Sequence, residues 1–165
     1  MHKSRRWYAL YTKSRAEKKV YIELKERGME VYLPLVKTLR QWSDRKKKVE
    51  IPLIPSYVFV FVNQKEYRKA LEVNGAVCYI TFEGKPVPIP EDQINILKLV
   101  VENKMPAKAT QEDLLPGKEV KIISGPLKGK SGEIMETGRQ QRFLVRIAIG
   151  FNLIVDIEGA RLEAL

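Results

Sequence analysis

Residues 116–134 read PGKEVKIISGPLKGKSGEI, and this stretch decides the fold of the last third of the chain. Residues 119–122 alternate between charged and apolar side chains, which is the pattern of a half-buried strand. Gly125-Pro126 then turns the chain, and Gly129 and Gly132 permit a tight return into a following strand. We therefore predict two adjacent strands joined by a glycine-containing turn.

The same pattern continues after this stretch. Residues 143–149 and 153–157 are apolar and β-branched, and glycine-containing turns separate the strand patterns. Four or five short strands in about fifty residues cannot form an open sheet with two buried faces, so they predict a small closed β-barrel.

The first two thirds of the chain mix strand and helix patterns. Residues 57–62, YVFVFV, form the strongest strand pattern, because every side chain is aromatic or β-branched. We predict weaker strands at 7–11, 31–33 and 77–82. Apolar side chains at helical spacing, or helix-start residues, predict helices at 15–27, at 67–71 and from Pro90 onward.

Two local signals mark the ends of the first helix. Ser14 and Glu17 match the S-x-x-E capping box, in which each side chain satisfies an amide at the helix start. Gly28 follows Arg27 as a residue that accepts the left-handed conformation in which many helices end.

Two further segments lack the pattern of a buried element. Residues 37–50 carry six Lys or Arg side chains against Asp44 and Glu50, with Trp42 in the middle, and predict a hairpin or loop that projects from the sheet. Residues 105–113 are mostly polar, contain Pro106 and have no period, which predicts a linker. We therefore expect an α+β chain, with an antiparallel sheet and flanking helices at 1–104 and the β-barrel at 114–165.

The charge distribution is uneven. The net charge is +10; residues 1–103 hold 20 Lys or Arg against 12 Asp or Glu, and residues 104–165 hold 10 against 8. Clustered cations favour a polyanionic partner, because they release condensed counterions from nucleic acid. Solubility alone is the alternative explanation for the charge.

The composition excludes several classes of site. A single cysteine, Cys78, permits no internal disulfide and argues against a zinc cluster, and His2 is the only histidine. Ordinary catalytic triads, metalloprotease motifs and phosphate loops are absent from the sequence, so we expect no enzyme, cofactor or metal. No apolar run approaches the roughly 20 residues that span a bilayer, and we expect a cytoplasmic protein.

The stretch at 116–134 resembles the KOW motif, which occurs in NusG-type transcription factors and in some ribosomal proteins. The blocks WYALY at 7–11, PSYVFV at 55–60, GAVCYITF at 75–82 and VPIP at 87–90 are similar, in that order, to the NusG N-terminal domain. Within the family, the specialised RfaH-like and UpxY-like antiterminators look nearer than general NusG. The resemblance implies an NGN-like domain followed by an SH3-like barrel. A ribosome- or RNA-binding KOW protein is the alternative.

The resemblance implies that the first domain binds the β′ clamp helices of RNA polymerase through an apolar pocket. The matching aromatic residues are Tyr11, Tyr57, Phe59, Tyr79 and Phe82. Ordinary core packing is the alternative for these rings. Tyr57 and Phe59 share one face of their strand, and a small domain can bury one face and leave the other for binding.

Basic residues at comparable positions contact the non-template DNA strand in RfaH-like members. They are Lys13, Arg15, Lys18 and Lys19 here. The run Arg45, Lys46, Lys47 and Lys48, together with Trp42, is a second candidate for nucleic-acid contact. A solvated charged surface is the alternative in both cases.

The barrel of this family recruits a second factor, usually a small-subunit ribosomal protein or the Rho terminator. The corresponding loop is Gly125, Pro126, Leu127, Lys128 and Gly129, and we expect Leu127 at its tip, where the family often has Phe. The sequence leaves open which operons are served, whether a DNA element recruits the protein, and whether pausing is suppressed or promoted. It also leaves open an autoinhibitory or fold-switching barrel and the oligomeric state.

Overall fold

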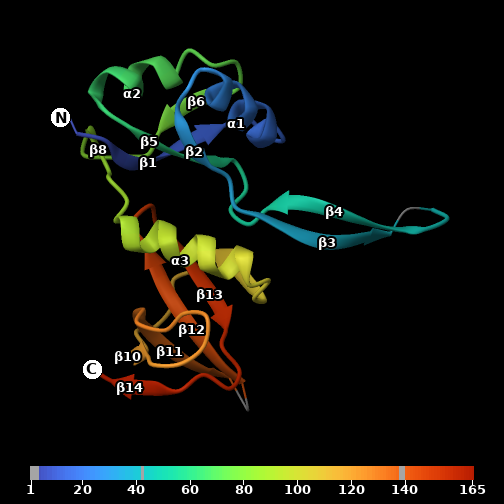
Figure 1. Cartoon of the computed structure of the whole chain (residues 1–165), viewed down its shortest axis with the longest axis vertical. Helices are drawn as coiled ribbons and strands as arrows, with labels where there is room; N and C mark the ends of the chain where they lie inside the picture. The colour runs from blue at the N-terminus through green and yellow to red at the C-terminus, as the bar shows by residue number, and fades with distance from the viewer. Residues whose placement is uncertain (1–3, 42, 138–139) are drawn as a thin grey trace. The chain divides into compact units, whose positions relative to one another are not determined.

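The computed structural model describes residues 4–41, 43–137 and 140–165, with side chains excepted at 136 and 137. The chain divides into two compact units, Met1–Glu91 and Asp92–Leu165 (Figure 1). The predicted contact residue Trp42 lies outside the described residues. No helix of the described residues is long and apolar enough to cross a membrane.

The first unit is built on a four-stranded antiparallel sheet in the order β2-β5-β1-β6. The strands are β1 (Arg6–Thr12), β2 (Glu30–Tyr32), β5 (Tyr57–Val62) and β6 (Ala76–Tyr79). In the central pair, Tyr8 lies opposite Val60, Leu10 opposite Val58, and Tyr11 opposite Tyr57. Since side chains alternate between faces, this register assigns each residue of β1 and β5 to one side of the sheet.

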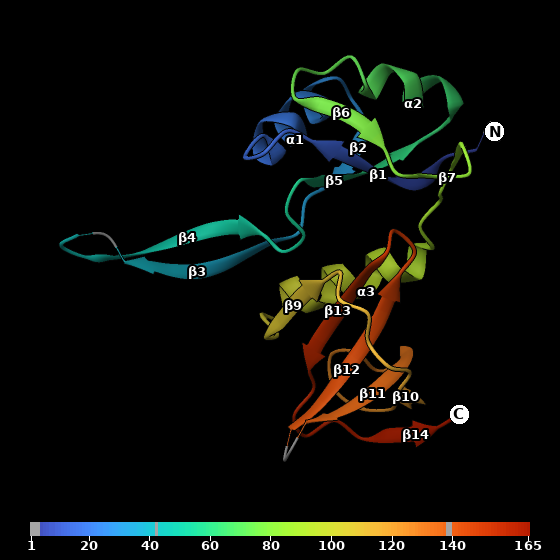
Figure 2. The ribbon, with the colours of Figure 1, turned by 180° about the vertical axis from the view of Figure 1, so that it is seen from behind.

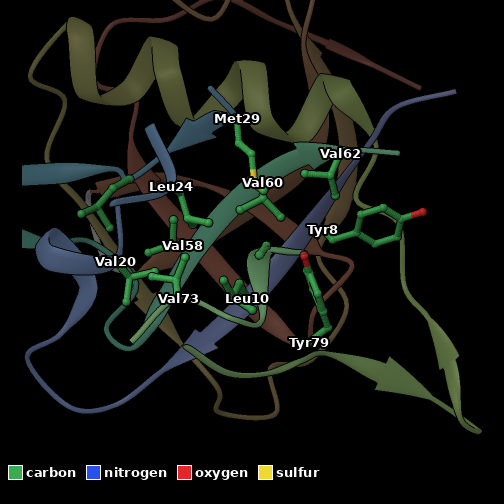
Figure 3. Close-up of a cluster of buried hydrophobic side chains, with 12 residues drawn as sticks. Tyr8, Leu10, Val20, Leu24, Met29, Val58, Val60, Val62, Val73 and Tyr79 are labelled. Atoms are coloured by element: carbon green, nitrogen blue, oxygen red, sulfur yellow. The ribbon is translucent and has the colours of Figure 1, made fainter. Parts of the chain in front are cut away.

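One face of this sheet carries the core. Tyr8, Leu10, Val58 and Val60 pack there with residues of two helices, α1 (Glu17–Glu26) and α2 (Gln64–Ala70). Figure 3 shows Val20 and Leu24 of α1 pointing toward the valines of β5. Burying a side chain of this size contributes about 1.5–3 kcal/mol, so the helix-covered face holds the unit together.

The start of α1 differs from the prediction, whereas its end agrees with it. The capping box at Ser14 and Glu17 is wrong: Ala16 is the N-cap, without a side-chain hydrogen bond, and the Glu17 carboxylate accepts from the backbone N–H of Ser56. Gly28, with φ of 84°, ends α1 as predicted, because its N–H and that of Met29 donate to Lys25 and Leu24. A capping box does occur at α2, between Asn63 and Glu66.

Two hairpins project from the first unit. The longer, which we call the arm, pairs β3 (Leu35–Gln41) with β4 (Lys46–Pro52) and confirms the hairpin predicted at 37–50 (Figures 1 and 2). The shorter pairs β7 (Thr81–Phe82) with β8 (Lys85–Pro86). Its turn residues Glu83 and Gly84 both have positive φ, 51° and 74°, as a tight type I′ turn requires.

The second unit is a six-stranded antiparallel sheet in the order β14-β10-β11-β12-β13-β9. Its strands are β9 (Ala107–Thr110), β10 (Lys118–Ile122), β11 (Ser131–Thr137), β12 (Gln140–Ile147), β13 (Phe151–Asp156) and β14 (Leu162–Ala164). The helix α3 (Glu91–Glu102) precedes them, directly after Pro90 as predicted. The α+β class, with a small barrel-like β domain after a sheet with flanking helices, is confirmed.

Part of the segment expected as a linker has regular structure. Residues Ala107–Thr110 form β9, which pairs with β13 along its outer edge. Asp156 N–H donates to the Pro106 carbonyl over 2.9 Å, and the Asn152 side chain donates to the Glu112 carbonyl over 2.9 Å. The segment is only four residues long and its apolar residues are alanines, so its alternation is too weak to reveal a short edge strand of this kind.

The glycine-containing turn between β10 and β11 also differs in detail. Leu127 is 1% exposed, and so packs inside instead of standing at the tip as expected. Gly129, with φ of 89°, reverses the chain as predicted, and its N–H donates to the Ile122 carbonyl. Gly132 is needed for close packing, because an added Cβ would lie 2.5 Å from the Phe143 ring.

A charged network fastens the chain just before β10. The Arg146 guanidinium pairs with the Glu133 carboxylate over 2.7 Å and donates to the Leu114 carbonyl over 3.0 Å. Glu133 also accepts from Gly117 N–H over 2.9 Å. The hydrogen bond from Arg146 is the main cause that lowers the pKa of Glu133 below its ordinary value of 4.5.

We expect Glu133→Gln to destabilise the protein at neutral pH and to flatten the acid side of its stability profile. A carboxylate whose pKa is depressed by folding contributes stability above its unfolded pKa, and loses it as pH falls through the folded pKa. Denaturant unfolding of the full chain between pH 3 and 7 measures this. The conservative control is Glu163→Gln on exposed β14. A profile that stays parallel to that of the parent chain would contradict the assignment.

Candidate partner-binding surface

An aromatic pair lies on the sheet face opposite the helix-covered core. Leu10 and Val58 point into the core, so their neighbours Tyr11 and Tyr57 point to the other side. Their ring centroids are 5.4 Å apart, and Tyr11 is 39% exposed while Tyr57 is half-buried. Burial is the main cause that raises the pKa of Tyr57 above its ordinary value.

The structure does not bring the five predicted aromatic residues into one pocket. Phe59 shares the face of Tyr57 but has no exposed surface. Tyr79 lies on the opposite face, within the core, where its ring stacks on Tyr67 with centroids 3.7 Å apart. Burial raises the pKa of Tyr79 well above its ordinary range. Phe82, in the shorter hairpin, is 70% exposed. The accessible members are therefore Tyr11, Tyr57 and Phe82, and we call these three the aromatic surface.

Cys78 is a neighbour of this surface that the sequence reasoning did not select. It lies directly opposite Tyr11 in the β1–β6 pairing and its side chain is exposed. In a strand, Cys78 lies on the same face as Ala76, but the sequence does not tell which face of the sheet that is until the pairing of β6 with β1 is known. The register of distant strands, and not any local motif, places this thiol beside the two tyrosines.

The basic residues near α1 have similar exposure but differ in their contacts. Lys13, Arg15 and Lys19 have exposed side chains on the turn before α1 and in its first turns. Lys18 is exposed as well, and its side chain donates to the Glu50 carbonyl of β4 over 2.7 Å. All four predicted cations are therefore on the surface, and Lys18 also links the arm to α1.

The arm concentrates cations along both of its strands. Arg45, Lys46, Lys47 and Lys48 are all exposed. Arg40 lies directly opposite Lys47, and Lys46 opposite Gln41. Like charges that face each other across a two-stranded ribbon destabilise it, and an anion bound between them would relieve the repulsion. Leu39 adds a 60% exposed apolar side chain opposite Lys48.

The KOW-like loop of the second unit offers a different surface from the expected one. Its exposed residues are Gly125, Pro126, Lys128 and Gly129, whereas Leu127 is buried. Ile123, just before this loop, is 41% exposed and supplies an apolar contact that the sequence reasoning missed. Lys130 forms an ion pair with Asp92.

The described residues contain no group of three or more His, Cys, Asp or Glu that could hold a metal ion. The candidate sites consist of aromatic, basic and backbone groups, which bind partners through burial, charge and hydrogen bonds.

Comparison with known proteins gives consistent matches over nearly the whole chain. The family model described as transcription termination factor nusG matches residues 5–98, and the KOW motif model matches residues 116–146. The transcription termination/antitermination protein NusG of Pseudomonas aeruginosa is 29% identical, with 97% of this chain and 98% of that protein covered. NusG of Staphylococcus carnosus is 25% identical, with 98% and 97% covered. A solved structure, "Domain interaction in Thermotoga maritima NusG", is 27% identical with 92% of each chain covered and a TM-score of 0.48.

We expect Phe59→Ala and Phe82→Ala to have very different effects on folding. Phe59 is 0% exposed, so its truncation should cost about 3–5 kcal/mol of unfolding free energy. Phe82 is 70% exposed, and its truncation should cost less than about 0.5 kcal/mol. Denaturant unfolding of the full-length variants compares the two. Equal losses would contradict the division between supporting and accessible rings.

Proposed function

Because the chain belongs to the NusG family of transcription termination/antitermination factors, we propose that its first unit binds RNA polymerase at the β′ clamp helices and contacts the adjacent DNA. The second unit then recruits a further factor. The protein acts by tethering partners and by biasing polymerase toward or away from pausing and termination, without chemistry of its own.

The aromatic surface is the observation that carries the polymerase contact. Tyr11 and Tyr57 form a close pair on the sheet face opposite the helix-covered core, and Phe82 exposes most of its ring on the shorter hairpin. Aromatic rings bury large areas with few rotors to order, so they supply binding energy efficiently at protein interfaces. Phe59 and Tyr79, although part of the same family-derived group, support this region from buried positions.

The cations support a contact with the non-template strand or the neighbouring duplex. Lys13, Arg15 and Lys19 lie in the segment that follows Tyr11, the first residue of the aromatic surface. The arm carries the second group at residues 45–48. Contacts from these flexible side chains to phosphates give affinity without sequence selection, which suits a factor that follows polymerase along the template.

The second unit supports recruitment through the exposed part of its loop. Pro126 and Lys128 are exposed, and Ile123 adds an apolar side chain beside them. A small-subunit ribosomal protein or Rho is the proposed partner. Tethering of this unit raises the effective concentration of its partner near polymerase. The NGN-like and KOW domains at 1–104 and 114–165 are the proposed functional divisions of the chain.

We expect Tyr57→Ala combined with Phe82→Ala to weaken binding to reconstituted RNA polymerase elongation complexes by at least about tenfold. Loss of two ring contacts at the centre of an interface typically removes more than about 1.4 kcal/mol. Full-length protein is titrated onto elongation complexes with and without excess isolated clamp-helix fragment. The fragment should compete with the elongation complexes for binding of the parent chain.

The matched control is Ile22→Ala, which removes an apolar side chain 54% exposed on α1, away from the proposed surface. It should bind as the parent chain does. Unchanged affinity of the folded double variant would refute the aromatic surface as the polymerase contact. Failure of the parent chain to bind polymerase, together with sedimentation with ribosomes, would favour a ribosome-binding function instead.

We expect Lys46→Gln, Lys47→Gln and Lys48→Gln together to weaken binding to elongation complexes that carry upstream DNA, and to make binding less dependent on salt. Each lost phosphate contact lowers the slope of log affinity against log salt by about 0.7–0.9. Fluorescence anisotropy with labelled DNA scaffolds at several salt concentrations measures both quantities.

The control for this variant removes the same charge from α2, as Lys65→Gln, Arg68→Gln and Lys69→Gln. Its affinity should fall only slightly and its salt slope should stay close to that of the parent chain. Equal changes in the two triple variants would show that the arm acts only through overall charge.

A further inference from the structure

We propose that Glu17 is the positioning residue of the aromatic surface, because its buried carboxylate fixes the backbone from which Tyr57 projects. The inference rests on the proposed function of that surface and names a residue outside it. Glu17 is buried and is not a member of the aromatic surface, so its effect must pass through the strand ends that it holds.

Glu17 is the single buried carboxylate among the residues that the structure describes, with 6% of its surface exposed. Burial of a charged side chain is costly unless hydrogen bonds replace the water that it loses. Glu17 lies in the first turn of α1, where the helix N-terminus favours negative charge. Its carboxylate is nevertheless directed to another part of the chain, since it does not cap its own helix.

That other part is Ser56, the residue that enters β5. The Glu17 carboxylate accepts from the Ser56 N–H over 3.3 Å. Ser56 has φ of 70°, a left-handed conformation that costs a residue with a side chain about 1 kcal/mol or more. On its other side, the Ser56 carbonyl accepts from Thr12 N–H over 2.8 Å. Ser56 is therefore held in an unfavourable conformation from both sides.

The two residues next to this contact are the paired tyrosines. Tyr57 follows Ser56 directly, and Tyr11 precedes Thr12 directly. The β1–β6 pairing shifts register between Tyr11 and Thr12, so the strand is irregular at the point where the ring leaves the sheet. On its other side, β1 pairs regularly with β5 up to Tyr11 and Tyr57, so the contact through Ser56 lies at the end of that ladder and holds the last pair in place.

The next residue of α1 acts on the same segment from its other end. Lys18 donates to the Glu50 carbonyl over 2.7 Å, and Leu53 N–H donates to the Pro34 carbonyl over 2.9 Å at the base of the arm. Two consecutive residues of α1 therefore contact the chain before and after the turn from β4 to β5: Lys18 at Glu50 within β4, and Glu17 at Ser56. Glu17 is the one of the pair that lies next to the tyrosines.

Three substitutions of Glu17 separate the effect of side-chain length from the effect of charge. Glu17→Gln keeps an oxygen acceptor at the same distance from the backbone and removes the charge. Glu17→Asp keeps the charge and draws the acceptor back by one methylene. Glu17→Ala removes both. If a hydrogen bond to Ser56 positions the surface, Glu17→Gln should preserve the arrangement of the tyrosines, whereas Glu17→Asp and Glu17→Ala should not.

The first readout is affinity for elongation complexes, measured on full-length protein at a temperature where circular dichroism shows every variant folded. We expect Glu17→Asp to lower affinity roughly fivefold to tenfold and Glu17→Gln to stay within about twofold of the parent chain. Glu17→Asp also keeps the experiment decisive if Glu17→Ala does not fold.

The second readout is independent of polymerase. Cys78 is the only cysteine of the chain, it is exposed, and it lies opposite Tyr11 in the sheet. Its rate of reaction with a thiol reagent should therefore change in Glu17→Asp and remain near the parent value in Glu17→Gln. A variant that only lowers global stability would not change this rate under folding conditions.

Unchanged affinity and unchanged Cys78 reactivity in folded Glu17→Asp would overturn the proposal. Equal losses in Glu17→Gln and Glu17→Asp would also overturn it, because the hydrogen-bond acceptor would then not be the decisive group. Failure of the proposed function gives a different pattern. Tyr57→Ala with Phe82→Ala would then leave polymerase binding intact, while the Cys78 rates would still report whether Glu17 positions the strand ends.

Discussion

The register between β1 and β5 is the constraint on which the first unit depends. Tyr8 opposite Val60 and Leu10 opposite Val58 place four apolar side chains under the helices, and the same alignment sends Tyr11 and Tyr57 to the other side. Because a strand has a period of two, a slip by one residue would exchange these sets. The tyrosine rings would then be driven into the helix-covered core, and Leu10 and Val58 would leave it. The stability of the unit and the availability of its aromatic rings are therefore two results of one alignment, and neither can change without the other.

Most of the architecture could be predicted where one strong local pattern had one structural solution. The apolar run at 57–62, the end of α1 at Gly28, the charged hairpin at 37–50 and the start of α3 after Pro90 are of this kind. The predictions were wrong where one sequence pattern is compatible with two structures. Glu17 fits a capping box as well as it fits a contact with a residue 39 positions away, and only the folded chain decides between them. Leu127 looks like a turn tip locally, yet the path of the barrel chain turns it inward.

The aromatic residues show why a site is harder to predict than a fold. Family resemblance selects Tyr57, Phe59 and Tyr79 equally, but the structure gives them three different environments: half-buried beside Tyr11, fully buried, and stacked within the core on Tyr67. Their residue type suits every one of these environments, since a ring packs well in a core and at an interface. Exposure, which depends on contacts between distant segments, is the property that distinguishes them. The position of Cys78 beside Tyr11 could not be inferred for the same reason.

The strand β9 has a consequence for solubility and for the handling of shortened chains. It covers the outer edge of β13. Five of the six residues of β13 are buried, and most of its side chains favour strands. An uncovered edge of that composition is a template for pairing with another copy and for aggregation. The Ala-Lys-Ala-Thr sequence of β9 adds little apolar area, but it fills the backbone hydrogen bonds and carries Lys108 on its exposed side. A fragment cut immediately before residue 114 would lose this cover, so the segment that the sequence predicts as a linker also guards the second unit against self-association.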